Sequence, residues 1–396
     1  MRHAIAVAAL LSLAGDADAR PGEMRGLWVV RTALVSPESV DRVVELAANA
    51  GFNALFVQVR GRGDAFYASG LVSRSALLER QPASFDPLDR LLEQARARGL
   101  EVHAWFNVLL TAHFPTRLPG DHVLSRHPEW VMVPREIARV ARRAGGKELL
   151  SLVREASRDD PDVEGYYLSP SSPGVAAHLV DAVRELAARY PVDGLHWDFI
   201  RYPGPRYDYS RWALQGFREW RGGGDLHEGP EDSPAAWATY RRGVLNSLAR
   251  RLGEAARQVR PGVVVSAAVV PEEAAAVHHK FQAWPAWVDR GIIDAICPMA
   301  YTTSPEIFRR QVAHAQQRAG AEGKVWAGIG SYRLPLADSI DRIRTARQMG
   351  AEGVVLYSHE SFGPADLQPL RQAFGSTGVA LELTGSGTLR GAAPGR

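Results

Sequence analysis

The 396-residue sequence contains a single cysteine, Cys297, so no disulfide can form within one chain. Its apolar stretch near the N terminus, residues 4–13, is shorter than the ~20 residues that a membrane-spanning helix needs. The formal net charge is only +3, which gives no electrostatic argument for nucleic-acid binding. Paired His-x-His or His-x-x-x-His spacings are missing, as is a Gly-rich nucleotide-binding turn after the first apolar run. We therefore expect no cofactor and no metal, and we expect Cys297 to be a buried residue of a strand.

Eight short apolar runs divide the sequence, and each ends in polar or aromatic residues. These runs are 24–32, 53–60, 100–107, 192–199, 263–271, 293–302, 324–333 and 352–361. Stretches with helical periodicity follow them, at 40–50, 87–98, 175–190, 236–259, 285–290, 304–319, 336–349 and 366–374. Strands that are apolar nearly throughout are typical of a parallel sheet covered on both faces. The alternation predicts an α/β fold, a (β/α)8 TIM barrel, in preference to a doubly wound open sheet.

The regions outside this alternation predict the domain organisation. Residues 1–19 combine a basic start, an apolar run and small residues before the expected cleavage site, as a signal peptide does, so we expect an exported protein, periplasmic or secreted. Residues 23–374 form the expected barrel, and the Gly/Ser/Thr-rich residues 376–396 are expected to be a disordered tail. Long loop insertions are expected after strands 3 and 4, over 109–173 and 204–234. The first contains an Arg-rich stretch, 135–143, that predicts a solvated amphipathic helix.

Asp198 is the most informative single residue. It ends an apolar strand, where a charged carboxylate is costly unless neighbouring groups stabilise it. In a TIM barrel the carboxyl ends of the strands form the active site. Asp198 is therefore a candidate catalytic residue, and the competing interpretation is that it only pairs with Arg201 to hold a loop.

An ordered set of motifs resembles the glycosyl-hydrolase-like family 10, formerly domain of unknown function 187. The motifs are Glu23-Met24-Arg25-Gly26-Leu27-Trp28-Val29, the run 51–60, the run 99–107, His127-Pro128-Glu129-Trp130, Gly194-Leu195-His196-Trp197-Asp198 with Arg201-Tyr202-Pro203, and Pro298-Met299-Ala300-Tyr301. The resemblance covers 23–374 and departs from the family pattern over 135–164. It implies a (β/α)8 barrel, an exported bacterial protein and hydrolysis of glycosidic bonds in an envelope or extracellular polysaccharide, with peptidoglycan glycan strands as one candidate.

Glycoside hydrolysis usually needs two carboxyl groups. Asp198 is the expected principal catalytic carboxylate, and Glu360 and Glu272, which follow strands 8 and 5, are the candidates for its partner. A different route stays open because Met299-Ala300-Tyr301 resembles the Met-x-Tyr of chitinase-like barrels, in which the N-acetyl group of the substrate acts as nucleophile. A non-catalytic glycan-binding barrel is the alternative function.

The remaining polar and aromatic residues at the strand ends are predicted to bind substrate, because they offer hydrogen bonds and flat faces to a sugar. They are Arg31, Gln58, Arg60, His103, Trp105, Asn107, His196, Arg201, Tyr202, Met299, Tyr301, Tyr332 and Tyr357. We expect the catalytic and binding side chains to share one pocket. The expected partner is a polysaccharide or cell-wall glycan, with no nucleic acid and no stable membrane insertion, and the expected state is a monomer.

Overall fold

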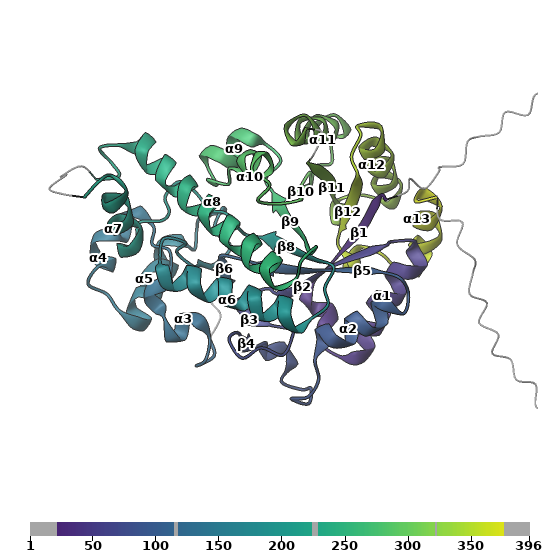
Figure 1. The fold of residues 1–396 in the computed structure, drawn as a ribbon, viewed down its shortest axis with the longest axis horizontal. Helices are drawn as coiled ribbons and strands as arrows, with labels where there is room; N and C mark the ends of the chain where they lie inside the picture. Colours follow the sequence, from purple (N-terminus) through teal and green to yellow (C-terminus); the bar gives the residue numbers. More distant parts are fainter. Residues whose placement is uncertain (1–21, 115–117, 224–228, 321–322, 376–396) are drawn as a thin grey trace, which may run out of the picture.

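The computed structural model describes residues 22–114, 118–223, 229–320 and 323–375, and its centre is a closed parallel barrel (Figure 1). The barrel strands are β1 (Met24–Val29), β2 (Ala54–Arg60), β5 (Glu101–Asn107), β8 (Gly194–Asp198), β9 (Val264–Val269), β10 (Ala295–Pro298), β11 (Lys324–Gly330) and β12 (Gly353–Tyr357). Each strand pairs in parallel with its neighbour in this order, and β1 pairs with both β2 and β12, which closes the barrel. The predicted (β/α)8 barrel is confirmed, with all eight apolar runs as its strands.

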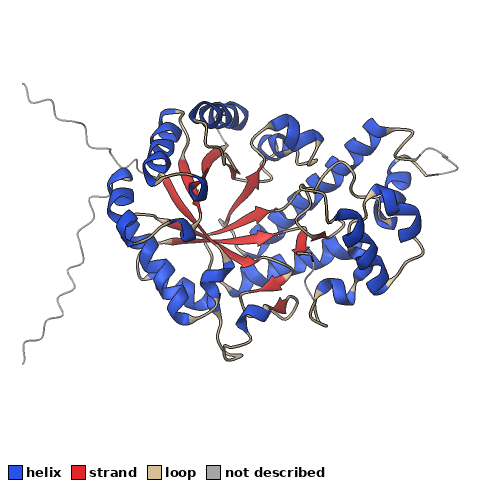
Figure 2. Ribbon diagram, turned by 180° about the vertical axis from the view of Figure 1, so that it is seen from behind, coloured by secondary structure: helices blue, strands red, loops and turns tan. Residues whose placement is uncertain are grey.

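Helices surround the strands on the outside of the barrel (Figure 2). They are α1 (Pro37–Ala50), α2 (Pro87–Arg96), α6 (Pro173–Arg189), α8 (Pro234–Val259), α10 (Trp284–Asp289), α11 (Pro305–Ala319), α12 (Leu336–Gln348) and α13 (Leu367–Ala373). Every stretch with helical periodicity is found as a helix. Local signals set the ends of α1. Ser36 caps its first turn, and Gly51 is the C-cap residue, with a left-handed φ of 84°.

Both predicted insertions are present, and they carry structure of their own. The first contains β6 (Leu110–Ala112), α3 (Val123–Arg126), α4 (Ala138–Ala141), α5 (Gly146–Ser157) and β7 (Tyr166–Tyr167), and the second contains α7 (Arg211–Trp220). Shorter elements complete the chain: the strands β3 (Asp64–Ala65) and β4 (Ser73–Arg74) after β2, and α9 (Glu273–His278) after β9. Among the described residues, no helix is long and apolar enough to cross a membrane.

The helix predicted over 135–143 is present but shorter. A 3-10 turn, Arg135–Ile137, runs directly into the four residues of α4. Gly145 then precedes α5, and glycine is a poor residue for a helix interior. Arg135 is also held by an ion pair with Glu231, 2.8 Å long, from the second insertion.

Large aromatic side chains fill the inside of the barrel. Trp28, Phe56, Trp105 and Trp326 form one cluster there with Cys297, whose side chain is completely buried. The expectation of a buried strand cysteine is therefore confirmed. The signal-peptide segment 1–19 and the predicted tail 376–396 lie outside the described residues.

Gly194, at the start of β8, leaves no room for a larger residue, because the side chain of His103 occupies the space beside it. His103 on β5 stacks on Phe56 with ring centroids 4.6 Å apart, and a Cβ atom at position 194 would lie 2.0 Å from His103 Nδ1. We expect Gly194→Ala to lower the free energy of unfolding by about 1–3 kcal/mol, because the buried ring has to move. Gly204→Ala is the matched control, since its Cβ would meet nothing within 4 Å. Urea unfolding of both variants checks this, and equal losses would contradict it.

Candidate active site

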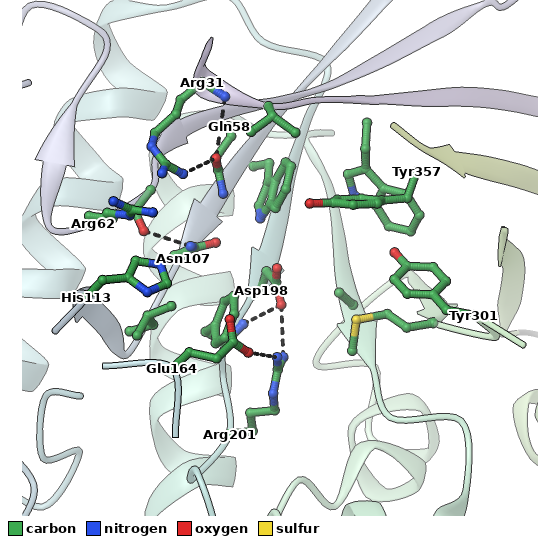
Figure 3. A pocket seen from close by; sticks show the side chains of 18 of the residues that line it. Arg31, Gln58, Arg62, Asn107, His113, Glu164, Asp198, Arg201, Tyr301 and Tyr357 are labelled. Atoms are coloured by element: carbon green, nitrogen blue, oxygen red, sulfur yellow. Dashed lines mark hydrogen bonds and ion pairs between the residues drawn. The ribbon is translucent and has the colours of Figure 1, made fainter. Parts of the chain in front are cut away.

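A cavity of about 500 Å³ opens at the carboxyl ends of the barrel strands (Figure 3). It collects ten of the residues predicted from the sequence: Arg31, Gln58, Trp105, Asn107, Asp198, Arg201, Met299, Tyr301, Tyr332 and Tyr357. Six barrel strands supply residues to its wall, because parallel strands that close a barrel bring their carboxyl ends together. The indole of Trp28, on β1, also lines the cavity.

Asp198 is the last residue of β8, and its side chain is held by two donors. Its Oδ1 accepts hydrogen bonds from the backbone N–H of Phe199, at 2.6 Å, and from Arg201 Nη1, at 2.9 Å. These two hydrogen bonds fix the position of a carboxylate that is only 6% exposed. Phe199 has a left-handed φ of 50°, which is uncommon for a bulky residue and costs ~1–3 kcal/mol. Backbone strain of this kind clusters at functional sites.

A second carboxylate faces the same arginine, and the sequence analysis did not identify it. Glu164 comes from the first insertion, and its Oε1 lies 4.0 Å from Arg201 Nη2 (Figure 3). Asp198 and Glu164 flank one planar guanidinium, so their oxygen atoms are at most roughly 9 Å apart. The two carboxyl groups of glycosidases lie roughly 5–9.5 Å apart. The structure thus brings together a pair of carboxyl groups.

The surroundings of Glu164 differ from those of Asp198. Partial removal from water raises the pKa of Glu164, and the neighbouring charge of Asp198 also raises it, against the opposing effects of Arg201 and Lys280. Its side chain remains 48% exposed at the cavity mouth. Two carboxyl groups in unlike environments suit the acid and base roles of one reaction.

Gly165 explains how the insertion delivers Glu164 to the cavity. A Cβ atom at position 165 would lie 1.9 Å from the carbonyl oxygen of Ala112, and Gly165 has a φ of 154° that favours glycine. The chain before β7 therefore packs directly against the end of β6. This contact holds Glu164 next to His113, which also lines the cavity.

The two carboxylates predicted as partners of Asp198 do not line the cavity, so these predictions are wrong. Glu272 is the residue before α9, on the outside of the barrel, where its Oε1 accepts a hydrogen bond from Gln311 Nε2. Glu360 lies in an exposed 3-10 turn after β12, and its Oε1 accepts a hydrogen bond from Thr32 Oγ1 at 2.7 Å.

Four residues predicted to bind substrate also lie outside the cavity wall: Arg60, His103, His196 and Tyr202. Side chains two apart in a strand face the same way at successive levels, so His196 and His103 lie deeper in the barrel than Asp198 and Trp105. His196 contacts Ser266 Oγ through Nδ1, at 2.9 Å, and accepts from Trp28 Nε1. Burial lowers the pKa of His196 to about 3, so it is a neutral support beneath the cavity.

The other two of these residues are buried beside the barrel end. The guanidinium of Arg60 donates to the carbonyl oxygen of Asn107 and lies over the ring of Phe106. Tyr202 is completely buried, with its ring 5.4 Å from that of Phe281. Both side chains therefore stabilise the loops around the cavity.

Aromatic rings form one wall of the cavity. The ring centroids of Tyr301 and Tyr357 lie 5.6 Å apart, and Tyr332 is 6.1 Å from Tyr301. Burial raises the pKa of Tyr301 well above its ordinary value, with a further contribution from Asp198, so the hydroxyl stays protonated. Flat rings with a polar tip suit the C–H faces and hydroxyl groups of a sugar.

Three buried polar atoms on the cavity wall are unpaired within the described part of the chain. One is Arg62 Nε, and the others are Asn107 Oδ1 and Trp105 Nε1, on side chains that are 2% and 4% exposed. Asn107 is fixed by its amide, which donates to the carbonyl oxygen of Gly61 at 2.8 Å. Buried polar groups are nearly always hydrogen-bonded, so these atoms are available to a ligand.

Comparisons with known proteins agree with this geometry. The family described as Glycosyl hydrolase-like 10 matches residues 23–343. The chain belongs to this family. It is 26% identical over 348 residues to glycosyl hydrolase DigH of Escherichia coli K12, covering 77% of this chain and 70% of DigH. It is 23% identical to glycosyl hydrolase YngK of Bacillus subtilis strain 168, covering 61% of this chain and 44% of YngK.

Solved structures of glycoside hydrolases share the fold of this Glycosyl hydrolase-like 10 member. The PgaB glycoside hydrolase domain of Bordetella bronchiseptica superposes with a TM-score of 0.65 at 15% identity, covering 89% of this chain and 99% of that domain. The catalytic domain of a β-amylase from Paenibacillus polymyxa gives 0.58 at 12% identity, covering 88% and 96%. The predicted family is confirmed, and a glycan-acting hydrolase is supported.

Besides Glu164, the sequence analysis did not identify Arg62 and His113, which line the cavity together with Arg31. Arg62 follows the end of β2 by two residues, and His113 follows the end of β6 by one. The feature that could have identified them in the sequence is their position just beyond a strand, which resembles the position of Asp198 at the end of β8. Within the described residues, no group of three or more histidine, cysteine or acidic side chains is arranged to hold a metal ion.

Proposed function

We propose that the chain is a glycoside hydrolase in which Asp198 and Glu164 act as the carboxyl pair. The observation that carries the proposal is that both groups contact the guanidinium of Arg201 at the carboxyl end of a barrel. The family and the aromatic cavity wall support the same reaction class. The tyrosines provide a surface for the sugar, and the carboxyl pair provides the chemistry.

The environments of the two groups support different roles. Glu164, with its raised pKa, protonates the oxygen of the leaving sugar. Asp198, stabilised as an anion by Phe199 and Arg201, either attacks the anomeric carbon or takes the proton of the attacking water. Arg201 holds the two carboxyl groups in fixed positions relative to each other, and its positive charge limits their mutual repulsion.

The proposed substrate is a bacterial envelope or extracellular polysaccharide, with peptidoglycan glycan strands as the first candidate. The export signal expected at residues 1–19 agrees with an enzyme that works outside the cytoplasm. The cluster of three tyrosine rings, Tyr301, Tyr332 and Tyr357, supports a sugar as the substrate.

A second mechanism uses the same residues. Tyr301 and Met299 line the cavity that contains Asp198, as substrate-assisted cleavage of N-acetylated sugars would require. In that route the acetamido oxygen of the substrate attacks the anomeric carbon, Tyr301 supports the acetamido group, and Asp198 protonates the leaving oxygen. De-N-acetylated glycan strands distinguish the two mechanisms, because only the substrate-assisted route loses its nucleophile with the acetyl groups.

Turnover distinguishes the hydrolase from the alternative, a non-catalytic glycan-binding barrel. The purified protein is incubated with peptide-free glycan strands, and new reducing ends and shortened products are measured by mass spectrometry. A hydrolase releases short products. A binding protein co-sediments with the polymer and leaves its length unchanged, and that result would overturn the proposal.

The pH dependence of kcat/KM tests the role of Glu164. A general acid must be protonated, so activity falls as the pH rises through the pKa of Glu164. Lys280 lowers this pKa by its charge, and Lys280→Gln is therefore expected to move the basic limb of the profile to higher pH. Lys280→Arg keeps the positive charge and serves as the control, in which the basic limb of the profile is expected to stay at the same pH. A limb that stays in place or moves to lower pH in Lys280→Gln would exclude Glu164 as the acid.

A further inference from the structure

Three basic side chains form the wall of the cavity that faces the tyrosines. They are Arg31, Arg62 and His113, which we call the cationic wall, and Figure 3 shows them together on the side opposite Tyr301 and Tyr357. They come from three different places in the chain: the turn after β1, the loop after β2 and the end of β6. Their convergence is therefore a property of the folded cavity and not of one basic stretch.

The two arginines have no carboxylate partner among the described residues. Arg31 Nη1 donates to the neutral amide oxygen Gln58 Oε1 at 3.0 Å. Arg62 Nε is buried and lacks a hydrogen-bond partner there. Asp64 accepts from the backbone N–H of Arg62, at 2.8 Å, and forms no ion pair with its guanidinium.

The members of the wall are close enough to repel one another. Burial lowers the pKa of Arg62, and the charge of Arg31 lowers it further, against the opposing charge of Asp64. Burial likewise lowers the pKa of His113, with both arginines adding to the effect, so the charges of the wall at neutral pH are those of the two guanidinium groups. Two partly buried guanidinium groups that form no ion pair within the described residues repel each other, and an anion bound between them would relieve this repulsion.

The acidic groups of the cavity do not neutralise this wall. Asp198 and Glu164 both pair with Arg201, and neither forms an ion pair with Arg31 or Arg62. Arg31 also lies directly over the backbone of Gly61, where a Cβ atom would be 2.9 Å from Arg31 Cδ. This packing fixes the direction of one guanidinium beside the other.

We propose that the cationic wall binds a carboxylate substituent of the sugar polymer, so that the site prefers an acidic glycan to a neutral one. The planar, forked guanidinium groups of Arg31 and Arg62 match the two oxygens of a carboxylate. The inference rests on the proposed function for the identity of the ligand as a glycan. It adds the chemical class of that glycan, an acidic sugar held between an aromatic and a cationic wall.

The test compares two glycans of equal length that differ only in charge. One is a peptide-free peptidoglycan strand, which carries a free carboxylate on every muramyl residue, and the other is the same strand after its carboxyl groups have been reduced to alcohols. Affinities are measured by intrinsic tryptophan fluorescence in the full chain with Asp198→Asn, which slows turnover. Trp28 and Trp105 line the cavity and supply the signal.

The Asp198→Asn chain is the parent of the variants below. It is expected to bind the acidic strand at least about tenfold more tightly than the reduced strand, which is the effect of one charge-assisted hydrogen bond or more. Arg62→Gln and, independently, Arg31→Gln are expected to reduce this ratio to near one. Arg344→Gln is the matched control, because Arg344 is an exposed residue of α12 paired with Asp341, and it should keep the ratio. Thermal unfolding of each variant verifies that it is folded.

Equal affinity of the parent for both strands, or an unchanged ratio in both arginine variants, would overturn the proposal. Turnover of both strands by the chain with its native Asp198 separates the proposal from the proposed function. If neither strand is cleaved while the acidic strand is still preferred, the hydrolase is excluded and the cationic wall stands. If both strands are cleaved and bound alike, the hydrolase stands and the cationic wall is excluded.

Discussion

Asp198→Asn is expected to reduce turnover of glycan strands by ~10²–10⁴-fold while leaving the fold intact. The asparagine still offers an oxygen to the Phe199 N–H and to Arg201, so the local hydrogen bonds can persist. It cannot attack a sugar or accept a proton from water. The measurement is the rate per folded molecule, with thermal unfolding recorded on the same samples.

Asp193→Asn is the matched control for this prediction. Asp193 precedes β8 by one residue, at the opposite end of the strand from Asp198, and its Oδ2 accepts from the backbone N–H of Val102 at 2.8 Å. Its loss is expected to affect stability and not turnover. If Asp198→Asn instead lowered stability and left the normalised rate unchanged, Asp198 would only hold the loop through Arg201.

Glu164→Gln is expected to cost a similar ~10²–10⁴-fold on natural glycans, because the leaving oxygen loses its proton donor. The loss should be much smaller on an aryl glycoside with an activated leaving group, which departs without protonation. This dependence on the leaving group distinguishes a general acid from a residue that only shapes the cavity.

Glu272→Gln provides the control for the Glu164 prediction. Glu272 lies outside the cavity beside Gln311, so its substitution is expected to leave both rates close to those of the parent. A loss of equal size on natural and activated substrates in Glu164→Gln would contradict the assignment of Glu164 as the proton donor.

The sequence was sufficient to predict the barrel and the position of Asp198. The barrel strands are buried on both faces and hence apolar nearly throughout, which makes each one visible as a run. Asp198 is conspicuous because it ends such a run, and the carboxyl ends of barrel strands meet at one face. These inferences depend on local patterns and on a general property of the fold.

The partner of Asp198 was not predictable in the same way. Glu164 reaches the cavity because the first insertion folds back and Gly165 packs on Ala112, a contact between loops that has no periodic signal. Glu272 and Glu360 follow strands as Asp198 does, but neither of them lines the cavity. The direction of a chain beyond a strand end depends on tertiary contacts.

The depth at which a side chain lies in the barrel could not be predicted from the sequence either. His196 and Asp198 face the same way on β8, yet only Asp198 lies at the level of the cavity. Alternation identifies the face to which a side chain belongs. The level at which the interior ends is set by the large rings, such as Trp28 and Phe56, that fill the barrel below.

The most direct test of the account is a crystal structure of Asp198→Asn with a bound oligosaccharide substrate. The account predicts a sugar against Tyr301 and Tyr357, with the glycosidic oxygen of the cleavable bond ~2.6–3.2 Å from a carboxyl oxygen of Glu164. The anomeric carbon should face the substituted side chain at position 198. A sugar bound outside this cavity, or one whose glycosidic oxygen lies beyond the reach of Glu164, would contradict it.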